Sequence, residues 1–193
     1  MLNTIDTYKI LYNQLVNYKP ENEQEEVDKN QFLWLLDSYK EKAFERSLLF
    51  GHITASAIVL DKSRKYMLMN FHNIYKSWAW FGGHADGEYD LYKLSLKELE
   101  EESGLNNVKL ICEGFSSIEI LSVDSHIKKG KFVPCHLHYN VTYLYEADIN
   151  EDIRIKEDEN SALSWIKLDD LYEHVKDDHD MYTIYIKSVN RVL

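Results

Sequence analysis

The segment from Gly82 to Leu105 constrains the fold of this chain more tightly than any other part of the sequence. A short apolar run leads into Gly82 and Gly83, and a helical pattern follows over about 90–103. Gly82, Gly83 and Gly87 predict a turn before the helix. Gly104 predicts the end of the helix, because glycine tolerates the positive φ of that position. A strand, a turn and an amphipathic helix in this order predict a mixed α/β domain in which the helix packs on a sheet.

Three glutamates of the predicted helix lie on one face. Glu98, Glu101 and Glu102 are three or four residues apart, which places them within about 100° of arc. The opposite face is expected to pack on the sheet, and it carries Tyr92, Leu96, Leu99 and Ser103. Like charges at these spacings destabilise an isolated helix. Either a bound cation compensates them, since Mg²⁺ binds carboxylate oxygens, or the glutamates form an ordinary solvated face.

Hydrophobic patterns divide the chain into two parts. Residues 1–45 predict an N-terminal extension of two helices interrupted by Pro20, and residues 46–193 predict the mixed α/β domain. Further strands are expected at 53–60, 65–71, 77–81, 108–123, 136–147 and 163–168, and the last helices at 171–175 and 181–192. The acidic start of the second helix, including Glu25, predicts a solvated helix end. The polar stretch 122–134 predicts either a hairpin or a lysine-bearing lid.

The composition narrows the class of protein. A length of 193 residues corresponds to one domain, with or without an extension. Cys112 and Cys135 are too few for a disulfide-rich scaffold. The net charge of -11 argues against general nucleic-acid binding, which needs clustered basic residues. Because we find neither a membrane-spanning run nor a signal-peptide pattern, we expect a cytoplasmic protein that does not bind membranes.

The segment around the three glutamates resembles the Nudix box, Gly-x5-Glu-x7-Arg-Glu-U-x-Glu-Glu-x-Gly-U, where U is a bulky aliphatic residue. Gly83 matches the opening glycine. The second half of the box is matched in register by Glu98, Leu99, Glu101, Glu102, Gly104 and Leu105. Tyr89 stands where the pattern has its first glutamate, and Lys97 where it has arginine. The resemblance implies an α/β/α sandwich with a mixed sheet, preceded here by the N-terminal helical extension.

The resemblance also implies an activity. Nudix enzymes hydrolyse the pyrophosphate bond of a nucleoside diphosphate linked to another moiety, using Mg²⁺ or Mn²⁺. Carried over by position, Glu98, Glu101 and Glu102 would bind the metal, with help from the Gly83 carbonyl. The candidate catalytic residues implied by the resemblance are Glu98, Glu101, Lys97 as the group that orients Glu98, and Glu159 as a base on a later loop, with Glu157 as its neighbour. The implied partner is a small nucleotide-like substrate.

Tyr89 and Lys97 leave a second interpretation open, in which the chain is a weak or inactive module that binds a nucleotide metabolite for regulation. The intact Glu98, Glu101 and Glu102 favour the enzyme. The N-terminal helices are expected either to cover an edge of the sheet or to form a homodimer contact.

Three histidines are candidate substrate contacts. His136 and His138 would point to the same face of one strand, and His84 follows the two glycines. The competing interpretation is that they are ordinary structural or surface histidines. A zinc site is not expected, because no Cys/His framework surrounds the pair in the sequence.

Overall fold

The chain folds as two units whose segments alternate along the sequence. The computed structural model describes residues 4–73, 76–128, 130–156, 160–176 and 179–193. Unit 1 comprises the residues up to 55 together with 84–91 and 118–141, and unit 2 comprises 56–83, 92–117 and 142–193. The main sheet has the strand order β10-β2-β1-β9-β5, with β3, β4 and β6 pairing with β2, β1 and β9. None of the helices in the described ranges combines the length and the apolar character needed to cross a membrane.

Unit 1 contains the N-terminal helices and the strands that follow them. Its elements are α1 (Thr4–Asn17), α2 (Glu23–Tyr39), η1 (Lys40–Phe44), the start of β1 (Gly51–Asp61), the end of β4 (Phe81–His84), β6 (Ser117–Val123), β7 (His126–Lys128), β8 (Lys131–Val133) and the first part of β9 (His136–Ala147). Pro20 separates the two helices as predicted. Asn22 begins α2, because its side chain accepts a hydrogen bond from the Glu25 backbone N–H at 2.9 Å.

The prediction that the acidic start of α2 is solvated is wrong for Glu25. This side chain is fully buried. Its carboxylate accepts a hydrogen bond from the Glu21 backbone N–H at 2.9 Å, so that the cap is reciprocal: Asn22 accepts from Glu25 while Glu25 accepts from the residue before Asn22. Charge alone suggested exposure, whereas the capping geometry turns this carboxylate toward its own helix start.

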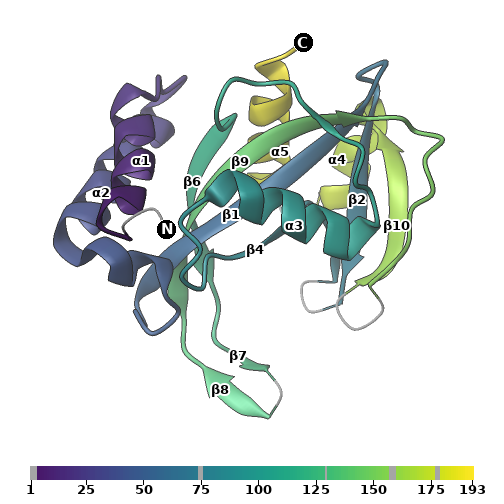
Figure 1. Cartoon of the computed structure of the whole chain (residues 1–193). Coiled ribbons are helices and arrows are strands. Elements are labelled where there is room, and N and C mark those ends of the chain that lie inside the picture. Colours follow the sequence, from purple (N-terminus) through teal and green to yellow (C-terminus); the bar gives the residue numbers. More distant parts are fainter. Residues whose placement is uncertain (1–3, 74–75, 129, 157–159, 177–178) are drawn as a thin grey trace. The chain divides into compact units, whose positions relative to one another are not determined.

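The stretch 122–134 contains the antiparallel hairpin β7–β8, in agreement with the simpler of its two interpretations. Ile127 pairs with Phe132 across the hairpin, and both side chains are exposed. In Figure 1 the hairpin extends away from β6 and β9, the strands of unit 1 that precede and follow it.

Unit 2 contains the remaining strands and the C-terminal helices. Its elements are β2 (Tyr66–His72), β3 (Ser77–Ala79), nearly all of α3 (Leu91–Ser103), β5 (Lys109–Leu110), β10 (Asn160–Lys167), η2 (Leu168–Asp170), α4 (Leu171–Val175) and α5 (His179–Asn190), together with the rest of β1, β4 and β9. The expected strand over 108–123 is interrupted between β5 and β6, where Gly114 has a φ of 73°. A left-handed residue at this point is incompatible with a continuous strand.

Helices cover both faces of the sheet within unit 2, which gives the predicted α/β/α sandwich (Figure 1). One face carries a buried apolar cluster with α4 and α5: Ile58, Leu60, Met67, Met69, Leu144, Ile166, Leu171, Val175, Tyr185 and Val189. The other face carries α3. There Ser95 and the Tyr145 hydroxyl share a hydrogen bond of 2.6 Å, and Tyr92 lies edge-on to Tyr143. Successive residues of β9 therefore serve opposite layers, as strand geometry requires.

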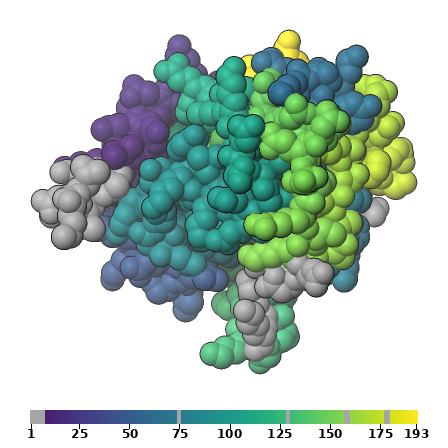
Figure 2. Space-filling view, turned by 45° about the vertical axis from the view of Figure 1, so that its right-hand side comes forward, coloured from purple at the N-terminus to yellow at the C-terminus, as the bar shows by residue number. Residues whose placement is uncertain are grey.

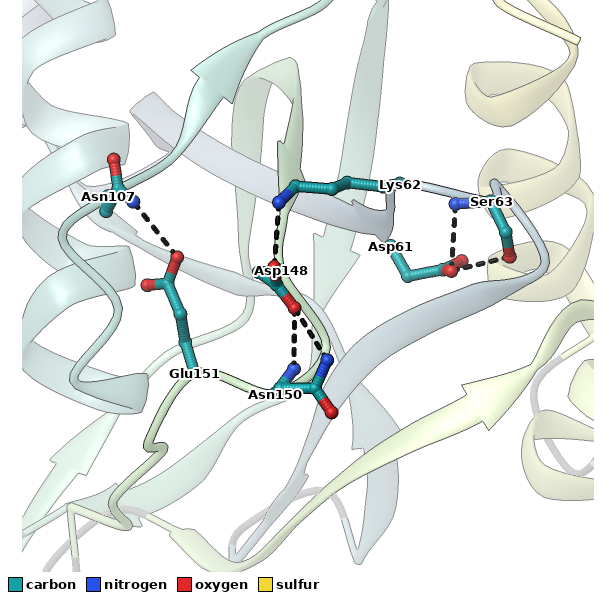
Figure 3. A network of polar contacts seen from close by, with 7 residues as sticks. All are labelled: Asp61, Lys62, Ser63, Asn107, Asp148, Asn150 and Glu151. Atoms are coloured by element: carbon teal, nitrogen blue, oxygen red, sulfur yellow. Dashed lines mark hydrogen bonds and ion pairs between the residues drawn. The ribbon is translucent and has the colours of Figure 1, made fainter.

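The turn between β1 and β2 is organised by one carboxylate. Asp61 accepts hydrogen bonds from the hydroxyl and backbone N–H of Ser63, and from the backbone N–H groups of Lys65 and Tyr66. Lys62, in the same turn, forms an ion pair with Asp148 at 2.7 Å (Figure 3). The Asp61 carboxylate thereby takes the place of the strand-to-strand hydrogen bonds that the backbone loses where it reverses direction.

The predicted turn forms at Gly87 but does not include Gly82 and Gly83. Both lie inside β4, and the turn follows at Asp86 and Gly87, which have φ values of 46° and 86°. The strand continues because β4 pairs with β1. Arg46 holds the Asp86 carboxylate through both Nε and Nη2, which stabilises an aspartate in a backbone region that side chains rarely adopt.

Candidate carboxylate site on α3

Two of the three box glutamates lie on the packed side of α3, not opposite to it as predicted. Glu102 is buried, and the Glu98 side chain is 14% exposed, whereas Glu101 is 44% exposed. Tyr92, expected on the packed side, is exposed. The buried stripe consists of Leu91, Leu94, Ser95, Leu99, Glu102 and Ser103. Glu98 and Glu102 lie on the same side of the helix as this stripe, because they follow Ser95 by three and seven residues.

The Glu98 carboxylate lies directly against Gly83. A methyl group added at Gly83 would lie 2.6 Å from Glu98 Cδ and 2.8 Å and 2.9 Å from its two oxygens. Only glycine leaves room for this carboxylate, which gives the opening glycine of the motif a steric reason. Burial raises the pKa of Glu98 above its ordinary value, and Lys97 lowers this pKa by less than burial raises it.

Two lysines contact the outer part of the glutamate face. Lys97 Nζ lies 3.5 Å from Glu98 Oε1 and 3.6 Å from Glu101 Oε1. Lys156 Nζ lies 3.7 Å from Glu101 Oε2. Lys97 thus places a positive charge between two of the box carboxylates. The Lys97 ammonium offsets the mutual repulsion of Glu98 and Glu101, a role that a bound metal ion can also fill.

Glu102 is held by two asparagines that the sequence analysis did not identify. Glu102 Oε2 accepts hydrogen bonds from Asn70 Nδ2 at 3.1 Å and from Asn160 Nδ2 at 3.4 Å. Asn70 Nδ2 also donates to the Trp80 carbonyl at 2.9 Å. Within the described part of the chain, the Oδ1 atoms of both asparagines are buried without a hydrogen-bond partner. These residues come from β2 and β10, and no spacing rule connects them to the helix.

The donor set of this face fits a hard divalent cation. It offers carboxylate oxygens from Glu98, Glu101 and Glu102, and the Glu98 carboxylate lies against Gly83. Mg²⁺ prefers oxygen ligands of this kind and is usually held by one or two carboxylates together with substrate phosphates.

The C-terminal end of α3 is fixed to the segment that precedes β10. The Arg154 backbone N–H donates to the Ser103 carbonyl at 2.8 Å. Gly104 has a φ of 78°, and a methyl group there would lie 2.7 Å from Arg154 Cγ. In Figure 2 this part of the light green segment lies beside the teal surface of α3. The Glu159 and Glu157 candidates lie outside the described residues.

Tyr89, which replaces the first glutamate of the box, belongs to unit 1. Its ring packs against Phe44 with centroids 4.8 Å apart. Burial raises the pKa of the Tyr89 hydroxyl, and Glu41 and Glu45 add to this effect. Glu88 Oε1 accepts hydrogen bonds from the backbone N–H groups of Tyr89 and Asp90, so that it stabilises the turn before α3.

The three candidate histidines come together in unit 1, with a fourth that the sequence analysis missed. His52, His84, His136 and His138 bring one ring nitrogen each to within 4.8 Å of one another. The expectation that no histidine framework surrounds His136 and His138 is therefore wrong. His52 lies at the start of β1, and its relation to the others depends on strand pairing, which single-sequence patterns do not reveal. Burial lowers the pKa of His52, which favours its neutral form.

Comparisons with known proteins agree on one family. A family model described as the NUDIX domain matches residues 51–186. An RNA pyrophosphohydrolase from Pelagibacter ubique (strain HTCC1062) is 30% identical over 124 residues, which cover 62% of this chain and 78% of that protein.

Two crystal structures of an Ap4A hydrolase from C. elegans are similar in fold. The binary complex has a TM-score of 0.52 at 19% identity, covering 70% of this chain and 93% of that one. The other structure has a TM-score of 0.52 at 17% identity, covering 73% and 98%.

Proposed function

The chain belongs to the Nudix family and is a pyrophosphohydrolase, and we propose that it acts with divalent metal ions on a nucleoside-diphosphate-linked substrate. The observation that carries the proposal is the close contact between Glu98 and Gly83 at the glutamate face of α3. This contact brings the first glycine of the motif next to its second half, where three carboxylates lie within about 100° of arc on the helix.

Glu98, Glu101, Glu102 and the Gly83 carbonyl would hold Mg²⁺ or Mn²⁺. When bound, such an ion neutralises charge on the pyrophosphate and lowers the pKa of a coordinated water. This is needed in a chain of net charge -11, which otherwise repels an anionic substrate.

Glu98 is the general base that the described residues support best. Its carboxylate is largely buried and lies against Gly83, whereas the Glu101 side chain is exposed. Lys97, 3.5 Å away, would orient the Glu98 carboxylate. Glu102 would stay fixed, because Asn70 and Asn160 donate hydrogen bonds to it. Glu159 remains the alternative base from the sequence analysis.

The domain boundary near residue 45, the substrate contacts of the three candidate histidines and a homodimer contact through the N-terminal helices stay predictions. The substrate class also requires a direct test. The names of the similar proteins put RNA and Ap4A first in a panel that includes ADP-ribose, NADH, nucleoside triphosphates and nucleotide sugars.

The test measures release of phosphate-containing products from this panel with Mg²⁺, with Mn²⁺ and with EDTA. Glu98→Gln and Glu101→Gln are expected to lower kcat by a factor of at least about 100, the usual scale for losing a general base. Glu100→Gln is the matched control, because Glu100 is an exposed residue of the same helix turn outside the glutamate face. Equal kcat values for Glu98→Gln, Glu101→Gln and Glu100→Gln would contradict the assignment of the catalytic site. Metal-dependent binding of a panel compound without any turnover would favour a regulatory binding module.

A further inference from the structure

We propose that His52, His84, His136 and His138 form a binding site for one transition-metal ion, with Zn²⁺ as the best match. This site is separate in its ligand chemistry from the carboxylates of α3, and it does not depend on the proposed function. Among the described residues these four side chains are the group of His, Cys, Asp and Glu whose ligand atoms come together closely enough to share an ion.

The four imidazoles converge from three strands of unit 1. His52 comes from β1, His84 ends β4, and His136 and His138 alternate on β9. Ring centroids lie 5.1 Å apart for His52 and His84, 5.1 Å for His52 and His136, and 4.9 Å for His84 and His138. Because β1, β4 and β9 belong to one sheet, their pairing fixes where these rings lie.

The hydrogen bonds of His136 direct its other ring nitrogen into the cluster. Its Nδ1–H donates to the Pro134 carbonyl at 2.8 Å, which leaves the lone pair on Nε2. Metal-binding histidines typically donate their second N–H to a carbonyl in this way. His136 Nε2 lies 3.2 Å from His138 Nε2. Two nitrogens bound to one tetrahedral zinc ion lie about 3.3 Å apart, given Zn–N bonds of about 2.0–2.1 Å.

His52 supplies an independent observation. Its side chain is 4% exposed, and its Nδ1 lies 3.5 Å from the Leu48 carbonyl. Its Nε2 is buried and has no hydrogen-bond partner among the described residues. A buried imidazole nitrogen without a partner is unfavourable in a folded protein unless something else binds it. A metal ion among the other three rings would accept this lone pair.

The ligand type selects the metal. Imidazole suits zinc and other late first-row ions, whereas Mg²⁺ prefers oxygen. Four protein ligands leave no open position on a tetrahedral zinc ion, which is the arrangement of structural zinc sites. The ion would join β1, β4 and β9 at the histidine cluster and would stabilise unit 1 without taking part in hydrolysis. His84, His136 and His138 would then be zinc ligands and not the substrate contacts predicted from the sequence.

The first experiment uses the full chain without a polyhistidine tag, stripped of metal by a chelator. Zn²⁺ is titrated against a competing chromophoric chelator, and Co²⁺ is added separately as a spectroscopic probe. One equivalent of Zn²⁺ and the strong visible bands of tetrahedral Co²⁺ are the expected results. Binding of less than half an equivalent, or the weak spectrum of octahedral Co²⁺, would overturn the proposal.

Variants locate the ion. His136→Gln and His138→Gln are each expected to weaken Zn²⁺ binding by a factor of at least about 100, since even second-shell partners contribute 10–100-fold. His126→Gln is the matched control, because His126 lies in the nearby hairpin, contacts the Asp124 carbonyl and is not in the cluster. Circular dichroism verifies that each variant is folded.

Glu101→Gln should bind Zn²⁺ at the histidines normally, so that a failure of this site and a failure of the proposed hydrolytic site are distinguishable. Equal weakening by His126→Gln and His136→Gln would contradict the assignment.

Discussion

Glu98 occupies the space that a side chain at Gly83 would need, with its Cδ 2.6 Å from the position of the missing methyl group. Gly83→Ala must therefore displace the Glu98 carboxylate. Because a shift of about 1 Å at a reacting group can cost about 100-fold in rate, we expect a kcat loss of that order. Steady-state kinetics with saturating Mg²⁺ measures it.

Gly114→Ala is the control for this substitution. Gly114 has a φ of 73° and open space around its Cα, so that alanine there adds backbone strain without a clash. It should lower Tm and leave kcat unchanged. Similar kcat values for Gly83→Ala and the wild type would show that the Glu98 position is unimportant.

Lys97→Arg is expected to preserve or raise kcat. Lys97 Nζ lies 3.5–3.6 Å from Glu98 and Glu101, at the long end of ion-pair distances. A guanidinium carries a planar fork that can hold a carboxylate through two hydrogen bonds. Lys97→Gln removes the charge and should lower kcat. A large fall in kcat for Lys97→Arg in a folded protein would contradict the orienting role.

Asn70→Ala is expected to destabilise the protein by about 1–3 kcal/mol, because it leaves the buried Glu102 carboxylate without one of its donors. Urea unfolding at neutral pH measures the effect. Asn107→Ala is the matched control: Asn107 donates to Glu151 at an exposed position (Figure 3), where such substitutions change stability by about 0.5 kcal/mol or less. Equal effects at the two sites would argue against a buried Glu102 network.

Asp61 links stability to pH. Burial alone would raise the pKa of Asp61, but hydrogen bonds from the Ser63 hydroxyl and from the N–H groups of Tyr66, Ser63 and Lys65 bring it below the ordinary value of 3.8. A carboxyl with a lowered folded-state pKa stabilises the protein above its unfolded pKa and loses this contribution as pH falls through the folded pKa.

Asp61→Asn should therefore differ from the wild type most above pH 3.8, and the difference should narrow below it. Thermal unfolding at a series of pH values from neutral to acidic tests this. A difference in Tm that stays constant over the whole range would contradict the role of the charge.

Local patterns predicted most of the fold. The Gly104 stop, the alternation in β9 and the helices near the C-terminus depend on neighbours in the sequence, and the structure confirms them. The turn at Gly82 and Gly83 was wrong because pairing of β4 with β1 extends the strand through the glycines. Pairing of distant strands is a tertiary effect, and glycine content alone does not report it.

The residues of the candidate sites also divide into those that local spacing predicts and those that distant strands contribute. The box glutamates were found from their spacing within one helix. Asn70 and Asn160, which hold Glu102, and His52, which completes the histidine cluster, are brought in by other strands. The packed side of α3 was predicted opposite to the glutamates, and this was wrong for Glu98 and Glu102. The hydrogen bonds from Asn70 and Asn160 to Glu102 come from other strands, and helical spacing does not reveal them.

Gly104 and Arg154 have a consequence for how such a chain can change over generations. The Arg154 side chain fills the space that a side chain at position 104 would need. The Arg154 backbone N–H also donates a hydrogen bond to Ser103, the residue next to Gly104. A larger residue at 104 therefore meets two obstacles, the Arg154 side chain and a backbone φ of 78° that residues with a Cβ rarely adopt. A smaller residue at 154 removes only the first of them, so that the order of the two substitutions matters while glycine stays favoured at the end of α3.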